Sequence, residues 1–202
     1  MIKCIIFDFG DVYINLDKPA TERRLIKKFN YKLTPEAHSI NKEYEIGKIS
    51  TEEFLSFYKN QIPNSEDIDI IEAWNAILLD FPKYRLDFIK NLKTKHKYKL
   101  ILLSNTNHLH INWIKNNIPF YHEFKSCFDQ FYLSHQINSR KPNKEIFNFV
   151  LEENSLTPEE CFFIDDTLEN TNTAKSIGMS VWNNNPDKDD IVNLFDLKKD
   201  LF

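Results

Sequence analysis

The chain has 202 residues, of which 42% are hydrophobic, 14% aromatic and 28% charged. This composition provides enough apolar surface for a packed core, so it excludes a disordered or collagen-like chain. The formal net charge is −4 and no long basic run occurs, so the chain lacks the charge pattern of a nucleic-acid-binding protein.

Glycine is unusually rare and occurs only at Gly10, Gly47 and Gly178. Average usage of about 7% would give about fourteen glycines in a chain of this length. Phosphate-binding loops that need several glycines, such as G-x-G-x-x-G, are therefore excluded. A phosphate ligand would have to be held mainly by side chains.

The cysteines and the N-terminal segment indicate a soluble protein of a reducing compartment. Cys4, Cys127 and Cys161 lack C-x-x-C spacing and stand among apolar residues, which predicts buried free thiols. The apolar N-terminal stretch is too short for a signal peptide, and no continuous apolar run approaches the roughly eighteen residues of a membrane span. We expect a cytoplasmic protein without membrane or nucleic-acid partners, as a monomer or weak homodimer.

The first 80 residues combine one strand with a long helical region. Residues 2–7 form an apolar, β-branched run, which predicts a strand buried on both faces. Thr51 and Ser65 each precede two acidic residues, as is typical of helix starts. Helical patterns without a convincing strand are predicted at about 18–30, 35–46, 51–60 and 65–80. The simplest interpretation is an all-helical insertion after the first strand.

Strands alternate with helices in the rest of the chain. Further strands are predicted at 98–103, 130–133, 161–164 and 180–182, and helices at 143–154 and 168–177, the latter ending at Gly178. This alternation predicts right-handed βαβ units and a parallel sheet. The expected fold class is α/β: a Rossmann-like three-layer α/β/α core of residues 1–16 and 81–202, with residues 17–80 as an inserted all-helical domain.

Polar side chains follow several of these predicted strands. Asp8 ends the first, Ser104 and Asn105 end the second, and Asp165 and Asp166 end the fourth. A loop after the third strand carries Lys141, just before a helix. Ligands of open parallel sheets bind outside the carboxyl ends of the strands. We therefore expect these side chains to lie close together at that edge of the sheet, which we call the rim.

The chemistry of such a rim is constrained by its charge. Three carboxylates repel one another in a dry pocket, and a hard divalent cation such as Mg²⁺ removes the conflict. Ser104 and Lys141 are then natural donors to phosphate oxygens. Asp8 is a candidate nucleophile, because carboxylates can form aspartyl-phosphate intermediates.

Four segments resemble, in order, the motifs of the haloacid dehalogenase (HAD) superfamily: FDFGDV (7–12), LLSNT (102–106), RKP (140–142) and FIDD (163–166). The insertion resembles the helical type C1 cap of that superfamily, and YEIGKISTEEF (44–54) resembles a cap segment common there. The chain is most similar to the bacterial branch that includes α-D-glucose-1-phosphate phosphatase.

The resemblance implies a role for each matching residue of the metal site. Asp8 would be both nucleophile and Mg²⁺ ligand, and Gly10 would offer its main-chain carbonyl to the metal. Asp166, with Asp165 beside it, would complete the metal shell.

The resemblance also implies the residues that hold the substrate. Ser104 and Asn105 would hold the phosphate, and Lys141 would bridge Asp8 and the phosphate during catalysis. The implied substrate is a small soluble phosphomonoester, for example a sugar phosphate.

One position departs from the superfamily's pattern. Phosphatases of this superfamily usually carry D-x-D in the first motif, and the second Asp protonates the leaving group and later activates water. Gly10 occupies that position here, and the neighbouring Asp11 is offset by one residue, so its carboxylate is expected to point elsewhere. A lost general acid/base typically costs 10²–10⁴-fold in rate.

Two other functions remain open from the sequence. A metal-independent 2-haloacid dehalogenase would also use an Asp nucleophile, although the paired Asp165 and Asp166 would be unhelpful beside a halide. A catalytically weak protein that binds a phospho-metabolite or a protein partner would be consistent with Gly10.

Several other residues have both a functional and a packing interpretation. His108 and His110 are spaced i, i+2, so on a helix they point apart and do not predict a metal site. For four residues of the insertion, two interpretations remain open, packing and substrate contact: Glu43, Tyr44, Glu45 and Trp74.

Overall fold

Five parallel strands form the central sheet, in the order β3-β2-β1-β4-β5. The computed structural model describes all residues from Met1 to Phe202. The strands are β1 (Cys4–Phe7), β2 (Lys99–Ser104), β3 (Gln130–Leu133), β4 (Cys161–Asp165) and β5 (Ser180–Asn183). Each predicted strand is confirmed, with ends displaced by no more than two residues.

The inner strands are apolar on both faces because helices cover both faces. In β1, Ile5 and Phe7 pack into one hydrophobic cluster, while Cys4 and Ile6 pack into another on the opposite side. All four side chains are fully buried. This explains why the strand reads as a continuous apolar run rather than an alternating one.

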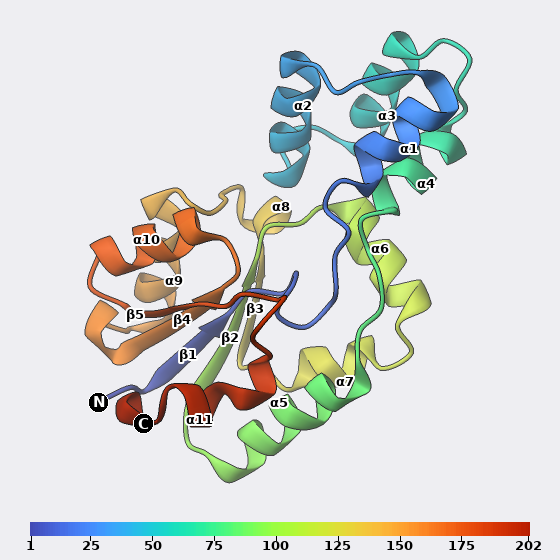
Figure 1. Ribbon diagram of the computed structural model, residues 1–202. Coiled ribbons are helices and arrows are strands. Elements are labelled where there is room, and N and C mark those ends of the chain that lie inside the picture. The colour runs from blue at the N-terminus through green and yellow to red at the C-terminus, as the bar shows by residue number, and fades with distance from the viewer.

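Helices form the two outer layers of the core (Figure 1). The cluster that contains Ile6 packs against α9 (Lys144–Asn154) and α10 (Leu168–Ser176). The other face is covered by α5 (Lys83–Lys95), α6 (His108–Asn117), α7 (Tyr121–Ser126) and α11 (Leu194–Leu197). The predicted three-layer α/β/α architecture is confirmed. The remaining short elements are α8 (Ser134–Ile137) and the 3₁₀ turns η1 (Pro158–Glu160), η2 (Ile191–Asn193) and η3 (Lys199–Leu201).

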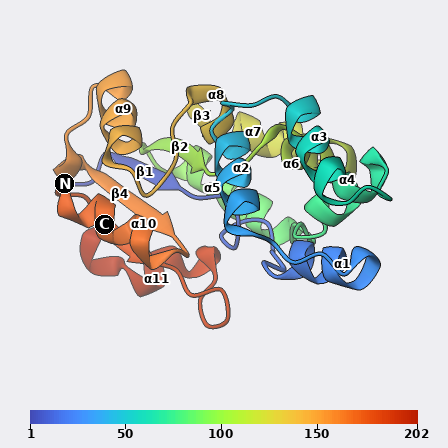
Figure 2. The ribbon, with the colours of Figure 1, turned by 90° about the horizontal axis from the view of Figure 1, so that it is seen from above.

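Four helices between β1 and α5 form a separate group, which we call the helical insert (residues 20–75). They are α1 (Ala20–Phe29), α2 (Pro35–Glu45), α3 (Thr51–Gln61) and α4 (Asp67–Asn75). Their core is aromatic: the rings of Tyr44 and Phe54 stack at 4.3 Å, and Trp74 meets Phe54 edge-on at 4.8 Å. The helical insert lies beyond the carboxyl ends of the strands, and Figure 2 shows it to one side of the sheet.

The N-cap residues of two helices in this group differ from the cap-like residues that the sequence suggests, although α3 begins at Thr51 as predicted. The cap of α3 is Ser50, not Thr51, because Ser50 and Glu53 form a reciprocal capping box. The cap of α4 is Glu66, not Ser65, whose hydroxyl instead donates to the carbonyl of Ile62.

The end of α4 was also predicted wrongly, because the helix stops at Asn75 rather than near residue 80. Residues beyond it pair with the segment that leaves β1: Leu78 bridges Leu16, and the amide of Asn15 donates to the carbonyl of Asp80 at 2.9 Å. The chain thus enters and leaves the helical insert through two adjacent connecting segments.

All three cysteines are buried and free, as predicted. None of the helices combines the length and the apolar character that crossing a membrane would require.

Candidate active site

Strand register brings Asp8, Asp165 and Lys141 together beyond the sheet. Phe7 is opposite Ile164 in the β1–β4 pair, so the next residues, Asp8 and Asp165, emerge side by side. The ammonium of Lys141 lies 2.8 Å from Oδ1 of Asp8 and 2.6 Å from Oδ2 of Asp165. The predicted convergence of these three side chains is therefore observed.

Lys141 is a fully buried cation between two carboxylates. Its side chain has 0% exposure, and burial alone would lower its pKa. The attraction of Asp165 and Asp8 outweighs burial, so the pKa of Lys141 is raised and the ammonium stays charged. Burial raises the pKa of Asp8, and Lys141 opposes this shift. On balance the pKa of Asp8 is raised to about 7, and the attraction of Lys141 limits the rise.

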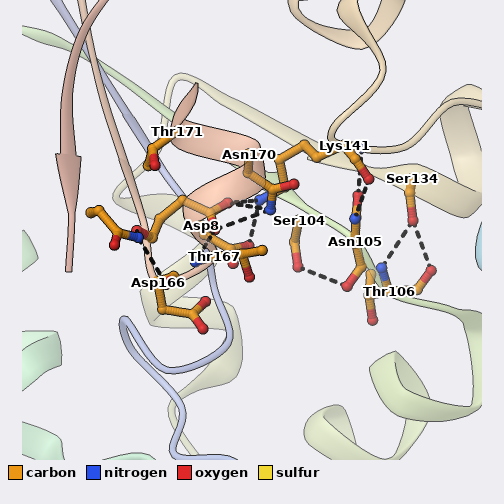
Figure 3. Close-up of polar contacts among 12 residues, drawn as sticks. Asp8, Ser104, Asn105, Thr106, Ser134, Lys141, Asp166, Thr167, Asn170 and Thr171 are labelled. Atoms are coloured by element: carbon orange, nitrogen blue, oxygen red, sulfur yellow. Dashed lines mark hydrogen bonds and ion pairs between the residues drawn. The ribbon is translucent and has the colours of Figure 1, made fainter. Parts of the chain in front are cut away.

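Asp165 accepts hydrogen bonds from three residues, Lys141, Thr167 and Asn170, which Figure 3 labels. Its Oδ1 accepts from the amide of Thr167 at 2.8 Å and from Nδ2 of Asn170 at 3.0 Å. Its Oδ2 accepts from Lys141 at 2.6 Å and again from Asn170 at 3.0 Å. Four hydrogen bonds occupy the lone-pair positions of this carboxylate, one of them from the Lys141 ammonium. Its predicted direct contact with metal stays a prediction.

Asp166 and Asp8 provide the more accessible oxygens of the acidic cluster. One carboxylate oxygen from each of Asp8, Asp165 and Asp166 lies within 4.8 Å of the others. Burial raises the pKa of Asp166, which Lys18 opposes through an ion pair with its carboxylate. Clustered carboxylate oxygens are the ligand set that a hard cation such as Mg²⁺ prefers, so these residues fit the expected metal.

Ser104 and Asn105 end β2 next to this cluster, but their side chains differ in availability. Ser104 is 3% exposed, and its hydroxyl makes one contact, to the carbonyl of Asn105 at 3.5 Å, the outer limit for a hydrogen bond. It is therefore free to donate to a ligand. The side-chain amide of Asn105 makes two hydrogen bonds of 2.9 Å with the main chain of Lys141: it donates to the carbonyl and accepts from the NH group. Its predicted contact with phosphate stays a prediction.

The carboxylate of Asp11 already has two partners, one of which, Lys18, it shares with Asp166. Its Oδ1 accepts from the amide of Leu16 at 2.9 Å, and its Oδ2 lies 3.0 Å from the ammonium of Lys18. Its backbone is left-handed, with φ at 52°. The carboxylate of Asp11 is thus committed to the segment that leads into the helical insert.

A cavity of about 100 Å³ opens beside Gly10 and Ser104. It lies between the core and the helical insert, which contributes one residue, Glu45 of α2. Its lining residues are Phe9, Gly10, Ile14, Leu16, Glu45, Ile77, Leu78, Ser104, Asn105, Thr106, His110 and Ile114. The cavity thus adjoins Ser104 and Phe9, the residue that follows Asp8.

The structure separates the residues for which two interpretations were open. Tyr44 and Trp74 are buried packing residues, and the indole NH of Trp74 donates to Asn107 at 3.2 Å. Glu43 pairs with Lys48 at 3.0 Å and does not line the cavity. Of the four, only Glu45 lines the cavity.

Three further polar residues of the site were not predicted. Asn170 stands five residues after Asp165, on the first turn of α10, where a polar side chain on the core-facing side was the available signal. Ser134 is fully buried between Thr106 and the carbonyl of Glu45, and Lys18 pairs with both Asp11 and Asp166. Their partners come from distant segments, which local sequence patterns do not reveal.

The family model described as haloacid dehalogenase-like hydrolase matches residues 2–178. The chain belongs to this family. It is 30% identical over 196 residues to D-ribitol-5-phosphate phosphatase of Bacteroides thetaiotaomicron, covering 90% of this chain and 91% of that protein.

Solved structures of HAD family proteins agree with the fold. A HAD family enzyme of Bacteroides thetaiotaomicron in complex with magnesium and inorganic phosphate matches with a TM-score of 0.82 and 34% identity, covering 94% of this chain and 97% of that one. A HAD-like family hydrolase of Porphyromonas gingivalis matches with a TM-score of 0.77 and 30% identity, covering 90% of each chain. Magnesium, expected here from the acidic cluster, is present in the first of these two HAD structures.

Proposed function

We propose that this HAD hydrolase is a Mg²⁺-dependent phosphatase that hydrolyses a small phosphomonoester through an aspartyl-phosphate on Asp8. The observation that carries the proposal is the buried ammonium of Lys141, 2.8 Å from Oδ1 of Asp8. A cation in that position favours the ionised carboxylate and neutralises an approaching phosphate. The similarity to D-ribitol-5-phosphate phosphatase favours a sugar or polyol phosphate as substrate.

The reaction would proceed in two displacements at phosphorus. A carboxylate oxygen of Asp8 attacks, the bond from phosphorus to the ester oxygen breaks, and the alcohol leaves with a proton. Water then attacks the aspartyl-phosphate, inorganic phosphate leaves, and the carboxylate of Asp8 is restored. In both steps Ser104 and Lys141 donate to the phosphate oxygens.

The metal would be held by Asp8, Asp166 and the carbonyl of Gly10, with Asp165 beside them. When bound, Mg²⁺ would supply positive charge to the phosphate oxygens. Asn170 and the amide of Thr167 hold Asp165, so that carboxylate keeps Lys141 oriented throughout.

We further propose that residues 17–80 act as a cap domain over a core of residues 1–16 and 81–202. The cavity beside Ser104 is enclosed partly by Glu45 of the helical insert. Its volume of about 100 Å³ suits a short substrate chain. Closing the site in this way excludes water and selects substrates by size.

The test is release of inorganic phosphate from p-nitrophenyl phosphate and from a panel of sugar and polyol phosphates that includes D-ribitol 5-phosphate. We expect Mg²⁺-dependent turnover that the Asp8→Asn variant abolishes, while Asp187→Asn, an exposed loop carboxylate, keeps full activity. Absence of turnover on every ester, or equal activity of Asp8→Asn, would overturn the proposal. Chelator-insensitive halide release from 2-haloacids would instead support the dehalogenase alternative.

A further inference from the structure

The space beside Gly10 is filled by the side chain of Leu16. A Cβ atom placed on Gly10 would lie 2.6 Å from Cδ1 of Leu16, well inside van der Waals contact. A side chain at position 10 would therefore require Leu16 to shift. The neighbouring carboxylate of Asp11 is engaged by the amide of Leu16 and by Lys18. The proton donor that the leaving alcohol needs must come from another segment.

Two ionisable side chains, Glu45 and His110, line the cavity that Gly10 and Ser104 share. His110 has partners on both ring nitrogens: Nδ1 lies 3.1 Å from Nδ2 of Asn107, and Nε2 lies 3.1 Å from the carbonyl of Trp74. Burial lowers the pKa of His110 to about 4, so the ring is neutral near pH 7. This leaves Glu45 as the group that can exchange a proton with a ligand.

The carboxylate of Glu45 is available to a ligand. Its Oε2 atom is buried and accepts no hydrogen bond of normal geometry, although Nη2 of Arg140 lies 3.1 Å away. The ion pair with Arg140 thus leaves Oε2 without a well-aligned hydrogen bond, and a substrate oxygen could supply one.

The main chain around Glu45 is fixed to the core rather than to the helical insert alone. The hydroxyl of Ser134 lies 2.6 Å from the carbonyl of Glu45, and Nδ2 of Asn138 donates to the carbonyl of Ile46 at 2.9 Å. Gly47, with φ at +66°, permits a close approach, because a Cβ there would lie 2.2 Å from the carbonyl oxygen of His135. The end of α2 is thus anchored to α8, which gives Glu45 a defined position over the cavity.

We propose that Glu45 is the general acid and base of the reaction, in place of the second aspartate that the first motif lacks; this rests on the proposed phosphatase function. In the first displacement the O–H bond of the protonated Glu45 breaks, and its proton goes to the ester oxygen as the electron pair of the P–O bond moves there. In the second, the Glu45 carboxylate accepts a proton from the attacking water, which regenerates the acid.

The charges around Glu45 are consistent with this cycle. Burial raises the pKa of its carboxyl, and Arg140 and Lys42 oppose the shift. Arg140 comes from the loop before α9 and Lys42 from α2 itself, whereas the neutral His110 of α6 faces the same cavity. A carboxyl whose pKa is raised by burial and lowered by nearby cations can hold a proton in one step and release it in the next.

The experiment compares Glu45→Gln with wild type on a series of phosphate monoesters of increasing leaving-group pKa. Protonation matters most for poor leaving groups, so kcat/KM for alkyl phosphates should fall by about 10²–10⁴-fold, and for p-nitrophenyl phosphate by less than about tenfold. The slope of log kcat/KM against leaving-group pKa should steepen. Glu45→Gln should also release a burst of p-nitrophenol as the aspartyl-phosphate accumulates.

The matched control is Glu43→Gln, which makes the same chemical change two residues away on α2, outside the cavity. It should keep the wild-type slope. A uniform loss of kcat/KM across the series in Glu45→Gln, a rise in KM alone, or an unchanged slope would overturn the inference and leave the phosphatase function intact. Absence of phosphatase activity in the wild-type protein would remove both.

Discussion

Asn105 and Lys141 hold each other by two hydrogen bonds that run in opposite directions. Nδ2 of Asn105 donates to the carbonyl of Lys141, and the amide of Lys141 donates to Oδ1 of Asn105, both at 2.9 Å (Figure 3). The end of β2 thereby fixes the main chain from which the Lys141 ammonium reaches Asp8. The side chain of Asn105 positions the cation of the site.

Replacing Asn105 with Ala should lower kcat more than it weakens phosphate binding. Loss of both hydrogen bonds leaves the main chain of Lys141 unpaired, at a cost of about 1–3 kcal/mol in unfolding free energy. We expect kcat to fall at least tenfold, while the inhibition constant for inorganic phosphate changes less than about threefold. Denaturant titration and product inhibition measure the two effects. Ser104→Ala is the contrasting variant, because losing that free hydroxyl should weaken phosphate inhibition.

Gly10 and Leu16 should be energetically coupled. Gly10→Ala places a Cβ 2.6 Å from Cδ1 of Leu16, and overpacking of this kind costs typically 1–3 kcal/mol. In a Leu16→Ala background the clash is absent, so the same substitution should cost at least about 1 kcal/mol less. Unfolding free energies of the four proteins in this double-mutant cycle measure the coupling. Strict additivity would show that the two side chains do not compete for one space.

Mg²⁺ should stabilise the folded protein through Asp166. A ligand at 100 times its dissociation constant adds about 2.7 kcal/mol to the free energy of unfolding, so the Tm should rise with Mg²⁺. Asp166→Asn should reduce the apparent affinity at least tenfold, while the exposed Asp187→Asn should leave it unchanged. Lys18→Met should tighten binding a few-fold, because Lys18 pairs with Asp166 and competes with the cation. A Tm shift that persists in Asp166→Asn would place the metal elsewhere.

The arrangement of the core, and most of the polar residues at the carboxyl ends of its strands, could be predicted from the sequence. Apolar runs that end in Asp8, Ser104 and Asp165 identify strands, and parallel register then determines which side chains become neighbours. This inference needs only the local period of the chain and the handedness of βαβ units. It holds because the strands are buried on both faces, which makes their sequences distinctive.

The part of the site that the helical insert contributes could not be predicted in the same way. Glu45 reaches the cavity because α2 docks on α8 through Ser134 and through the close approach at Gly47, contacts between segments about 90 residues apart. Side-chain partners at that separation leave no periodic trace in one sequence. Helix ends could not be predicted from residue type alone. Ser50 and Thr51 are both good N-cap residues, and the capping box between Ser50 and Glu53 makes Ser50 the cap.

Acid should destabilise the protein through His110. Burial lowers the pKa of His110 from 6.5 to about 4. Between these two pH values His110 binds a proton in the unfolded chain but not in the folded protein. Stability is therefore full above pH 6.5 and is lost as the pH falls toward 4, by about 2–3 kcal/mol from this residue. In His110→Gln the loss of unfolding free energy between pH 7.5 and pH 4.5 should be smaller by that amount, as measured by denaturant titration. The exposed His38 on α2 provides the matched control, and His38→Gln should retain the wild-type loss. An equal loss in His110→Gln and wild type would show that other groups account for the acid sensitivity.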